Sequence, residues 1–547
     1  MTPKNLSSLD ACFLPFARSD APGLVVGVAH HGRTVYRRGF GLASVELGVT
    51  NSPATRMRIA STSKHFTALA ALLLQEEGRL DLDAGVRRYI PELPALAAEP
   101  TLRQLLTHTS GYRCYLDLGF ISDAMAIQPK GSALASQIRQ TEANFLPAEK
   151  FIYSNSGYHL VSIVVDRVSG MPFEQFLQQR IFAPLGMWDT QSVPGNFELL
   201  RGMATLHVSG PDGHWRRGIW PSEELRGEGG IVSTVDDMLA WLAHLRAPDK
   251  TIGSAESWRQ LMQPATLGDG SVCNYALGLL REDYRGLQVI HHAGSVFGGT
   301  CQMLTAPDAA LDIVIMTNGA LANPGELALK VVDALASDRL TAGPTARAAA
   351  QRFRPMIGRR YFSSATGTGF SFAEVAEERL GLSFMNFLPL PLKEQDGGQE
   401  LTLGIEEVAV GPLRFRTSDL AERGDAPQTL RFWEGSCVGP FEQMPAQPPE
   451  LARVAEGLVG RYRAADLGAD AEMRFADGKL RLHIAGGFGG NDLELEAWSA
   501  DVLAWSAISF PLLRGLISLE RDEAGRVQGL RLDTIRTRGL RFKRMAS

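Results

Sequence analysis

Hydrophobic positions recur with two different periods along the chain, and the change of period divides it. Between about residues 23 and 340, stretches with apolar residues three and four positions apart alternate with short apolar runs. These are the patterns of amphipathic helices and of strands. Phe66, Leu69 and Leu73 would share one face of such a helix, and Gly78 follows as a stop signal. We therefore expect a helix over residues 61–77.

The same criteria predict the other elements of this part. Residues 23–28 and 34–40 flank His31-Gly32 and are typical of a hairpin. Helices are expected over residues 156–169, 173–181, 233–245 and 324–340, and strands over residues 275–280, 287–292, 299–304 and 311–317. Strands at both ends with helices between them predict one α+β unit whose sheet joins the two ends.

Beyond residue 352 the pattern changes to short alternating runs separated by Gly and Asp turns. Examples are residues 401–403, 430–433, 472–475 and 480–483. Such runs are typical of all-β sandwiches or barrels. Residues 342–352 are expected to form a linker, and the Pro-rich residues 443–449 a hinge. The predicted division is therefore 1–341, 353–442 and 457–547.

The two β segments open alike, with Gly-Arg-Arg-Tyr at 358–361 and Gly-Arg-Tyr at 460–462. This similarity indicates a duplicated pair of barrels. Chance similarity between short strands explains it nearly as well, so both interpretations stay open.

Composition and charge restrict the class of protein. Of the 547 residues, 45% are hydrophobic and 21% are charged, the balance of an ordinary globular protein. The formal net charge of −5 provides no global basic field for nucleic acid or an anionic membrane. The longest apolar stretches, residues 23–29 and 68–74, are too short to span a bilayer. We expect neither a nucleic-acid nor a membrane partner.

Two features predict a cytoplasmic location. The N-terminal twenty residues carry acids and a proline where a secretory signal would be apolar. The five cysteines are scattered, without a CxxC or Cys/His spacing. Such a set is typical of reduced thiols in a reducing compartment.

The first candidate for chemistry is the sequence Ser61-Thr62-Ser63-Lys64. On a helix, residues three apart share a face, so the Lys64 amine could reach the Ser61 hydroxyl and activate it as a nucleophile. Ser61 at the helix start would also have outward-pointing N–H groups beside it, which suit an oxyanion. The motif also arises by chance, and a solvated lysine at a surface helix is the alternative.

The second candidate is Tyr153-Ser154-Asn155, directly before a predicted helix. A lysine cation beside a tyrosine favours the phenolate. We therefore expect Lys64 to lower the pKa of Tyr153, so that the phenolate takes the Ser61 proton. The amide of Asn155 could donate to a substrate carbonyl and accept from the lysine. The alternative is a helix start in which Ser154 or Asn155 is merely a cap.

The third candidate is His292-Ala293-Gly294-Ser295, at the end of a predicted strand. A glycine there allows close approach of the backbone to a ligand, and the Ser295 N–H could complete an oxyanion hole with that of Ser61. A hydrogen-bonded structural histidine is the alternative interpretation of His292.

In this order, Ser-x-x-Lys, Tyr-x-Asn and His-x-Gly resemble the motifs of the penicillin-recognising serine hydrolases. These include class C β-lactamases, DD-peptidases, related esterases and D-aminopeptidases. Residues 105–111, 182–187 and 230–234 support the resemblance, which covers about residues 20–340. It implies a β-lactamase-like antiparallel sheet flanked by helices. It also implies acyl transfer through an ester on Ser61, without metal or organic cofactor.

One departure from the motifs of this clan narrows the range of expected activities. The third motif of that clan is usually Lys-Thr-Gly or Lys-Ser-Gly, whose lysine holds a substrate carboxylate, and here it is His292-Ala293-Gly294. A histidine is mostly neutral at pH 7. The departure argues against β-lactamase or DD-carboxypeptidase as the main activity. The chain resembles the D-aminopeptidases in particular, because they too have a histidine at this place and two C-terminal antiparallel, lipocalin-like β-barrels.

In those enzymes a loop of the last barrel enters the active site and selects substrates with a free amino terminus. The matching stretch here is residues 485–492, with four glycines around Phe488 and with Asp492 as the expected partner of the ammonium group. An ordinary Gly-rich turn with a solvated aspartate is the alternative.

The sequence therefore predicts an aminopeptidase that releases a small N-terminal D-residue from peptides, amides or esters. The D-stereochemistry is implied by the resemblance alone. Ser61, Lys64 and Tyr153 would be catalytic, and Asn155, His292, Gly294, Ser295 and Asp492 would bind substrate. A carboxylesterase or weak β-lactamase with the same site is the first alternative, and a binding protein with a relic catalytic domain the second. The oligomeric state, a homodimer included, stays open.

Overall fold

Strand β1 (Leu24–His30) is where the two ends of the first part of the chain meet. It pairs antiparallel with β2 (Arg33–Phe40) on one side and with β13 (Leu311–Thr317) on the other. The computed structural model describes residues 3–341, 343, 346–403 and 413–546, with the side chains of residues 3–6 left out. Residues 342, 344 and 345 of the predicted linker and 404–412 of the predicted domain 353–442 lie outside the described residues.

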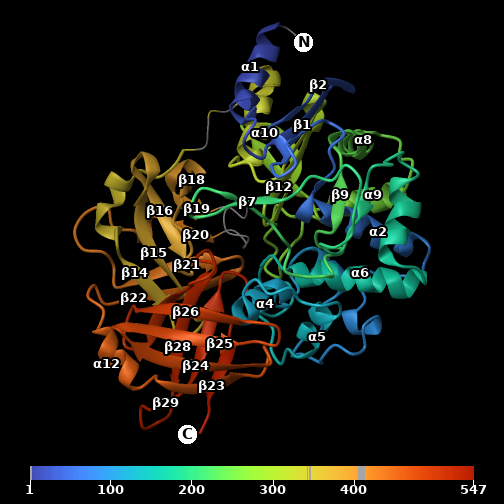
Figure 1. Cartoon of the computed structure of the whole chain (residues 1–547). Helices are drawn as coiled ribbons and strands as arrows, with labels where there is room; N and C mark the ends of the chain where they lie inside the picture. The colour runs from blue at the N-terminus through green and yellow to red at the C-terminus, as the bar shows by residue number, and fades with distance from the viewer. Residues whose placement is uncertain (1–2, 342, 344–345, 404–412, 547) are drawn as a thin grey trace.

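The complete sheet has the order β10-β11-β12-β13-β1-β2, so the predicted joining of both ends in one sheet is confirmed. Its other strands are β10 (Leu280–Tyr284), β11 (Leu287–Val296) and β12 (Gly299–Ala306). Helix α8 (Val235–Arg246) covers one face, and α10 (Pro324–Leu335) with α1 (Pro3–Phe13) covers the other (Figure 1). Every residue of β13 is buried for that reason.

The helix predicted over residues 61–77 begins instead with a tight 3₁₀ turn, Ala60–Ser63, and continues as α2 (Lys64–Glu76). Its residues from Lys64 to Leu74 are all buried, because α6 (Asn155–Ser169) and α9 (Ala255–Leu261) pack against it. The other elements of this part are α3 (Leu102–Leu106), α4 (Tyr115–Asp123), α5 (Ser132–Ile138), α7 (Phe173–Leu177), β3 (Leu42–Ser44), β4 (Val49–Thr50), β5 (Met57–Arg58), β6 (Gln191–Ser192), β7 (His207–Ser209), β8 (Trp215–Arg217) and β9 (Ile231–Ser233).

The strand predicted over residues 275–280 is wrong, since β10 begins only at Leu280. Gly278 turns the chain there with a φ of 81°, and a Cβ on it would lie 2.5 Å from the backbone nitrogen of His65. Only glycine fits this close approach to α2, and the turn ends any extended run before Leu280.

The second part forms an antiparallel sheet of nine strands that nearly closes on itself. Its order is β17-β16-β15-β14-β22-β21-β20-β19-β18. The strands are β14 (Arg360–Ser363), β15 (Thr368–Val375), β16 (Arg379–Phe384), β17 (Leu390–Pro391), β18 (Lys393–Gln395), β19 (Glu400–Leu403), β20 (Leu413–Arg416), β21 (Thr429–Glu434) and β22 (Cys437–Gln443). The edge strands β17 and β18 are separated by one residue, and Pro391 has no N–H with which to extend the ladder.

The third part is a closed antiparallel barrel of β23–β30, as predicted. Buried and exposed residues alternate along β25 and β26, so one face of each strand fills the interior. The strands are β23 (Gly460–Ala464), β24 (Ala469–Ala476), β25 (Lys479–Ala485), β26 (Gly490–Ala497), β27 (Val502–Ala507), β28 (Arg514–Arg521), β29 (Val527–Thr534) and β30 (Leu540–Arg544), and α12 (Leu451–Glu456) precedes them.

Helix α4 joins the barrel to the first part of the chain. It lies between α6 and strands β25 and β26 (Figure 1), and Leu118 and Ile121 belong to the barrel's hydrophobic cluster. Arg113, just before α4, is 1% exposed and donates to Asp466 at 2.6 Å and to the carbonyl of Arg538 at 3.0 Å. The barrel is thus fixed against this first part by buried polar contacts.

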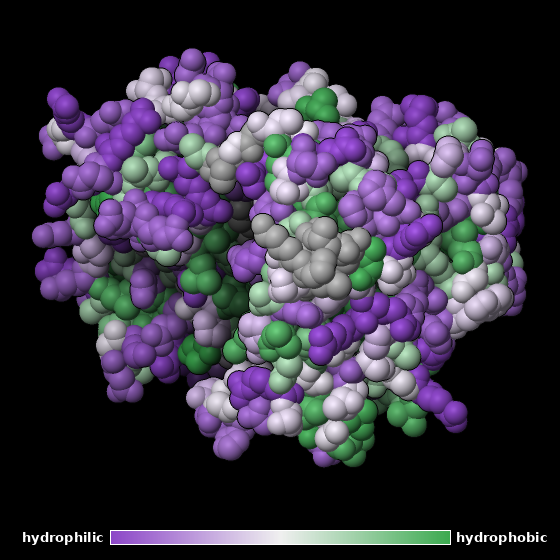
Figure 2. All heavy atoms as spheres, turned by 90° about the horizontal axis from the view of Figure 1, so that it is seen from above, coloured by the Kyte–Doolittle hydropathy of each residue, from purple (hydrophilic) through white to green (hydrophobic). Residues whose placement is uncertain are grey.

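Hydrophilic residues cover most of the face seen in Figure 2, and hydrophobic residues gather where that face is hollowed. Within the described ranges, the helices are all too short or too polar to cross a membrane.

Candidate active site

Ser61 lies in a turn that its neighbours hold in an unusual conformation. Ala60, directly before it, has a φ of 49°, a strained region for a residue other than glycine. Thr62 donates its hydroxyl to the carbonyl of His292 at 3.2 Å, so the turn lies against β11. A Cβ on Gly294 would lie 2.1 Å from the carbonyl oxygen of Ile59. Glycine is therefore required at residue 294 for β11 to approach the turn that presents Ser61.

Lys64 is fully buried, and its amine reaches three oxygen atoms. Its Nζ lies 3.1 Å from Oγ of Ser61, 2.8 Å from Oδ1 of Asn155 and 2.7 Å from the carbonyl oxygen of Glu228. Burial lowers the pKa of Lys64 to about 7, although the negative charge of Glu228 raises it. The charged amine has three N–H groups and can donate to all three oxygens. Once it has lost a proton, it can accept a hydrogen bond from the Ser61 hydroxyl.

Tyr153 completes the cluster from the segment before α6. Its hydroxyl is hydrogen-bonded to Ser61, and the Lys64 amine lies 4.8 Å from the centre of its ring. Burial raises the pKa of Tyr153 above its usual value, and this outweighs the lowering by the Ser61 hydrogen bond. The expected lowering of the Tyr153 pKa is therefore wrong, and burial disfavours the phenolate. The buried amine of Lys64 therefore loses its proton more readily than the buried hydroxyl of Tyr153 does.

His292 lies beside the cluster, with its ring centre 6.4 Å from that of Tyr153. It is 3% exposed, and its Nε2 lies 3.0 Å from the hydroxyl of Tyr275. Burial, and then Lys64, hold the pKa of His292 well below its usual value, so it is neutral, as expected for this position. The pairing of β10 with β11 stops at His291, so Ser295 lies on an edge of β11 beyond that pairing, with an exposed side chain.

His108 is a site residue that sequence reasoning did not single out. Its ring centre lies 4.1 Å from that of Tyr153, and its Nδ1 accepts from the backbone N–H of Ser154 at 3.1 Å. It has a φ of 58°. The available signal was the stretch 105–111, which was noted only as support for the family resemblance.

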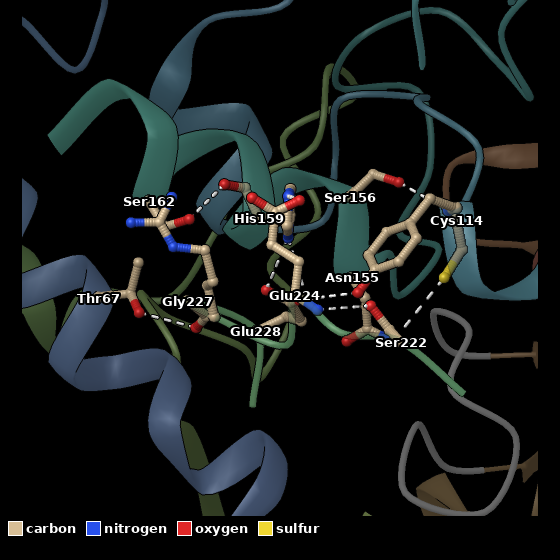
Figure 3. Close-up of polar contacts among 12 residues, drawn as sticks. Thr67, Cys114, Asn155, Ser156, His159, Ser162, Ser222, Glu224, Gly227 and Glu228 are labelled. Atoms are coloured by element: carbon tan, nitrogen blue, oxygen red, sulfur yellow. Dashed lines mark hydrogen bonds and ion pairs between the residues drawn. The ribbon is translucent and has the colours of Figure 1, made fainter. Parts of the chain in front are cut away.

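A buried polar cluster behind Lys64 was also missed. Nδ1 of His159 lies 3.1 Å from the carboxylate of Glu228, to which the Tyr115 hydroxyl also donates. Figure 3 shows Glu228 beside Asn155 and His159, which both belong to α6. Glu228 is 1% exposed, and its carbonyl is a partner of Lys64. No motif spacing in the sequence marks these three residues.

The expectation for Asp492 and its loop is corrected by the structure. Residues 485–490 fold around Asp123 at the end of α4, where the N–H groups of Phe488 and Gly489 donate to its carboxylate at 2.7 and 3.0 Å. A Cβ on Gly486 would lie 2.2 Å from the same carboxylate. The glycines therefore dock the barrel on α4.

Asp492 itself lies on the outer face of the barrel. It pairs with His483 at 3.0 Å, and its side chain is 53% exposed. Because side chains alternate along β26, Asn491 points inward to the carbonyl of Phe120 and Asp492 points outward.

Another hairpin of the barrel reaches the cluster instead. Residues 534–539 connect β29 and β30, and we call them the Arg536 hairpin. The guanidinium carbon of Arg536 lies 5.3 Å from the centre of the Tyr153 ring. The barrel thus contributes a cation beside the cluster, where an anion was expected.

An antiparallel sheet flanked by helices, with a serine, a lysine and a tyrosine gathered at its edge, defines the class of penicillin-recognising serine hydrolases. Residues 9–338 match the Beta-lactamase family, and the chain belongs to that family. The recognition made from the sequence motifs is confirmed.

Relatives are similar over the whole chain as well. A D-aminopeptidase of Brucella melitensis biotype 2 is 25% identical over 544 residues, 96% of each chain. A D-aminopeptidase of Brucella anthropi is 29% identical over 309 residues, 54% of this chain and 56% of that protein. These relatives indicate a serine hydrolase.

Two solved structures share the fold. The octameric penicillin-binding protein homologue from Pyrococcus abyssi is 21% identical with a TM-score of 0.57, covering 87% of this chain and 98% of that one. A D-amino acid amidase from Ochrobactrum anthropi SV3 is 24% identical with a TM-score of 0.51, covering 61% of this chain and 99% of that one.

Proposed function

We propose that the protein is a serine aminopeptidase that releases N-terminal D-amino acids from small peptides, amides or esters. The observation that carries the proposal is the position of the buried Lys64 amine, 3.1 Å from Oγ of Ser61, where burial lowers its pKa to about 7. The D-aminopeptidases that are similar over 96% of the chain support the substrate class.

In the acylation step, Oγ of Ser61 attacks the substrate carbonyl while its proton passes to Lys64. The N–H groups of Ser61 and Ser295 stabilise the oxyanion. The C–N bond then breaks, and the leaving nitrogen receives a proton from the hydroxyl of Tyr153. Tyr153 regains its proton from the protonated amine of Lys64, which lies beside its ring, so that the lysine is neutral again.

In the deacylation step, water attacks the Ser61 ester and gives its proton to the same lysine. The D-amino acid leaves, and the proton returns to Oγ of Ser61. Asn155 holds the Lys64 amine and orients the substrate carbonyl, and the aromatic wall of His292 borders the substrate. No step requires a metal or an organic cofactor.

A direct test compares D-alanine p-nitroanilide with its L form and with a p-nitrophenyl ester. We expect hydrolysis of the D-anilide at least about tenfold faster than of the L form, the usual scale of one good contact. Labelling by a fluorophosphonate should occur in the native protein and be lost in Ser61→Ala. Turnover of the ester alone would refute the peptidase.

A carboxylesterase or weak β-lactamase that uses the same site is the second candidate. Its support is that Asp492, the expected partner of the substrate ammonium, pairs with His483 on the outer face. The same three substrates distinguish the two functions. Absence of any fluorophosphonate labelling would favour the binding protein with a relic site.

The cytoplasm is the compartment that we propose. All five cysteines are free thiols, and Cys114, Cys273 and Cys301 are buried. In a disulfide-forming compartment cysteines typically stabilise the fold as disulfides, whereas these cysteines are unpaired.

A further inference from the structure

The Arg536 hairpin is held on both sides by the catalytic part. Asn144 donates its amide to the carbonyl of Arg536 at 2.8 Å and accepts from the N–H of Arg538 at 2.7 Å. The Thr534 hydroxyl donates to Asp117 at 2.6 Å, and Arg113 donates to the carbonyl of Gly539 at 3.2 Å. The hairpin backbone is therefore fixed independently of the Arg536 side chain.

The two arginines of this hairpin have different surroundings. Arg538 is 4% exposed, and its guanidinium lies 2.8 Å from the carboxylate of Glu434. Arg536 is only partly buried and lies over the Tyr153 ring. Its guanidinium has no carboxylate partner among residues 3–341, 343, 346–403 and 413–546. A structural role explains Arg538, whereas Arg536 presents unused donors beside the cluster.

Arg536 is also the permanent cation of the pocket. Burial lowers the pKa of Lys64 to about 7, and burial holds the pKa values of His108 and His292 well below the usual value. The carboxylate of Glu228 faces His159 and Tyr115 rather than Arg536. An anion that enters the pocket would therefore meet one fixed positive charge, in a fork suited to carboxylate.

The position of Arg536 identifies the part of the substrate that it meets. In the proposed mechanism Tyr153 gives a proton to the leaving nitrogen, so the leaving group lies beside Tyr153. In a dipeptide, the free carboxylate is two bonds from that nitrogen. We propose that Arg536 binds the terminal carboxylate of the leaving group. The enzyme then prefers dipeptides with an N-terminal D-residue over the corresponding dipeptide amides.

This proposal rests on the proposed function and specifies its substrate. It also revises the expectation that a histidine in the third motif leaves the enzyme with weak affinity for carboxylates. The barrel supplies from another part of the chain the positive charge that His292 lacks. The barrel would then select the length of the leaving group.

The test compares two substrates with the same scissile bond, D-alanyl-glycine and D-alanyl-glycinamide. In the native protein we expect the dipeptide to be the better substrate. Arg536→Gln should lower kcat/KM for the dipeptide by about 10–100-fold, mainly through KM, which is the scale of one charge-assisted hydrogen bond. Arg536 also lowers the pKa of Lys64, so the comparison is made at pH 9, where that amine is neutral. There the amide should change by less than about threefold, since it loses no charged contact.

Control variants and a second substrate pair locate the effect. Arg536→Lys keeps the charge and should keep part of the preference, and Arg461→Gln, which removes an exposed charge on β23, should keep all of it. An equal loss on dipeptide and amide would overturn the proposal in favour of a role in positioning Tyr153. A changed ratio between the α-amides of D-glutamate and D-glutamine would overturn it too, because Arg536 would then face the acyl side.

A binding assay separates this proposal from the proposed function. D-alanyl-glycine and D-alanyl-glycinamide are used to protect Ser61 from fluorophosphonate labelling, which requires no turnover. If the native protein hydrolyses no D-substrate, the aminopeptidase function fails. Stronger protection by the carboxylate that disappears in Arg536→Gln would still support the binding role of Arg536, and equal protection by the two compounds would overturn it.

Discussion

Nζ of Lys64 lies 2.8 Å from Oδ1 of Asn155, across 91 residues of sequence. This contact holds the amine that acts as the base in the proposed mechanism. Replacing the amide nitrogen of residue 155 by an oxygen changes the charge beside that amine. Asn155→Asp puts a carboxylate beside the amine and should raise the pKa of Lys64 by about 1–3 units. Activity at pH 7 should fall and recover above about pH 9. The measurement is the pH profile of kcat/KM with D-alanine p-nitroanilide.

Asn155→Ala is the control for that shift. It removes the acceptor without adding charge, so activity should fall by about 100-fold at every pH, the lower range of general-base contributions. A profile of Asn155→Asp that keeps the native midpoint would contradict the assignment of Lys64 as the base.

The native enzyme should itself lose activity in acid with a midpoint near pH 7. The protonated amine of Lys64 cannot accept the Ser61 proton, and its pKa is about 7, so the active form increases as pH rises through that value. Below the midpoint, kcat/KM should fall about tenfold per pH unit. Lys64→Arg should be inactive throughout, because guanidinium stays protonated. A midpoint above about pH 10, the ordinary value of tyrosine, would identify Tyr153 as the base, since burial raises its pKa.

Glu228→Gln should move the same midpoint toward lower pH. The negative charge of Glu228 raises the pKa of Lys64, so its removal leaves burial as the stronger influence and the amine loses its proton in more acidic solution. The shift is opposite in direction to that of Asn155→Asp, although both residues touch the same amine. His159→Gln, which keeps the carboxylate of Glu228 but removes its imidazole partner, is the matched variant and should not lower the midpoint.

The residues that sequence reasoning brought together carry local signals. Ser61 and Lys64 are three residues apart, and Gly294 lets β11 pass close to the carbonyl of Ile59. Helical spacing and the need for glycine are both visible in a sequence. The six-stranded sheet followed from the same periodicities, because nearly every strand ends at a turn signal.

The residues that were missed have no such signal. Glu228, His159 and Tyr115 meet only because three separate segments pack behind Lys64. Which barrel hairpin reaches Ser61 depends on how the barrel docks, and Arg113 fixes that through Asp466, 353 residues away. The glycines of residues 485–490 were visible, but their partner, Asp123, was not. A flexible turn and a turn that closes on a carboxylate look alike in a sequence.

The junction of the three parts offers a test of stability. Glu434 is 5% exposed and lies 3.0 Å from the Lys150 amine and 2.8 Å from the Arg538 guanidinium. Burial alone would raise the pKa of Glu434, but these cations, Arg538 first, hold it below its usual value. Its contribution is therefore present above the unfolded pKa, about 4.3, and is lost as pH falls through the folded pKa.

Glu434→Ala leaves two cations buried without a partner and should lower the free energy of unfolding by about 3–5 kcal/mol at pH 7. Urea denaturation followed by tryptophan fluorescence measures this loss, which should shrink as the pH is lowered toward 3. Glu422→Ala, which breaks the exposed pair with Arg352, should change little. Because Arg538 belongs to the Arg536 hairpin, Glu434→Ala should also weaken the preference for D-alanyl-glycine over its amide. Unchanged stability would mean that the junction is solvated in solution.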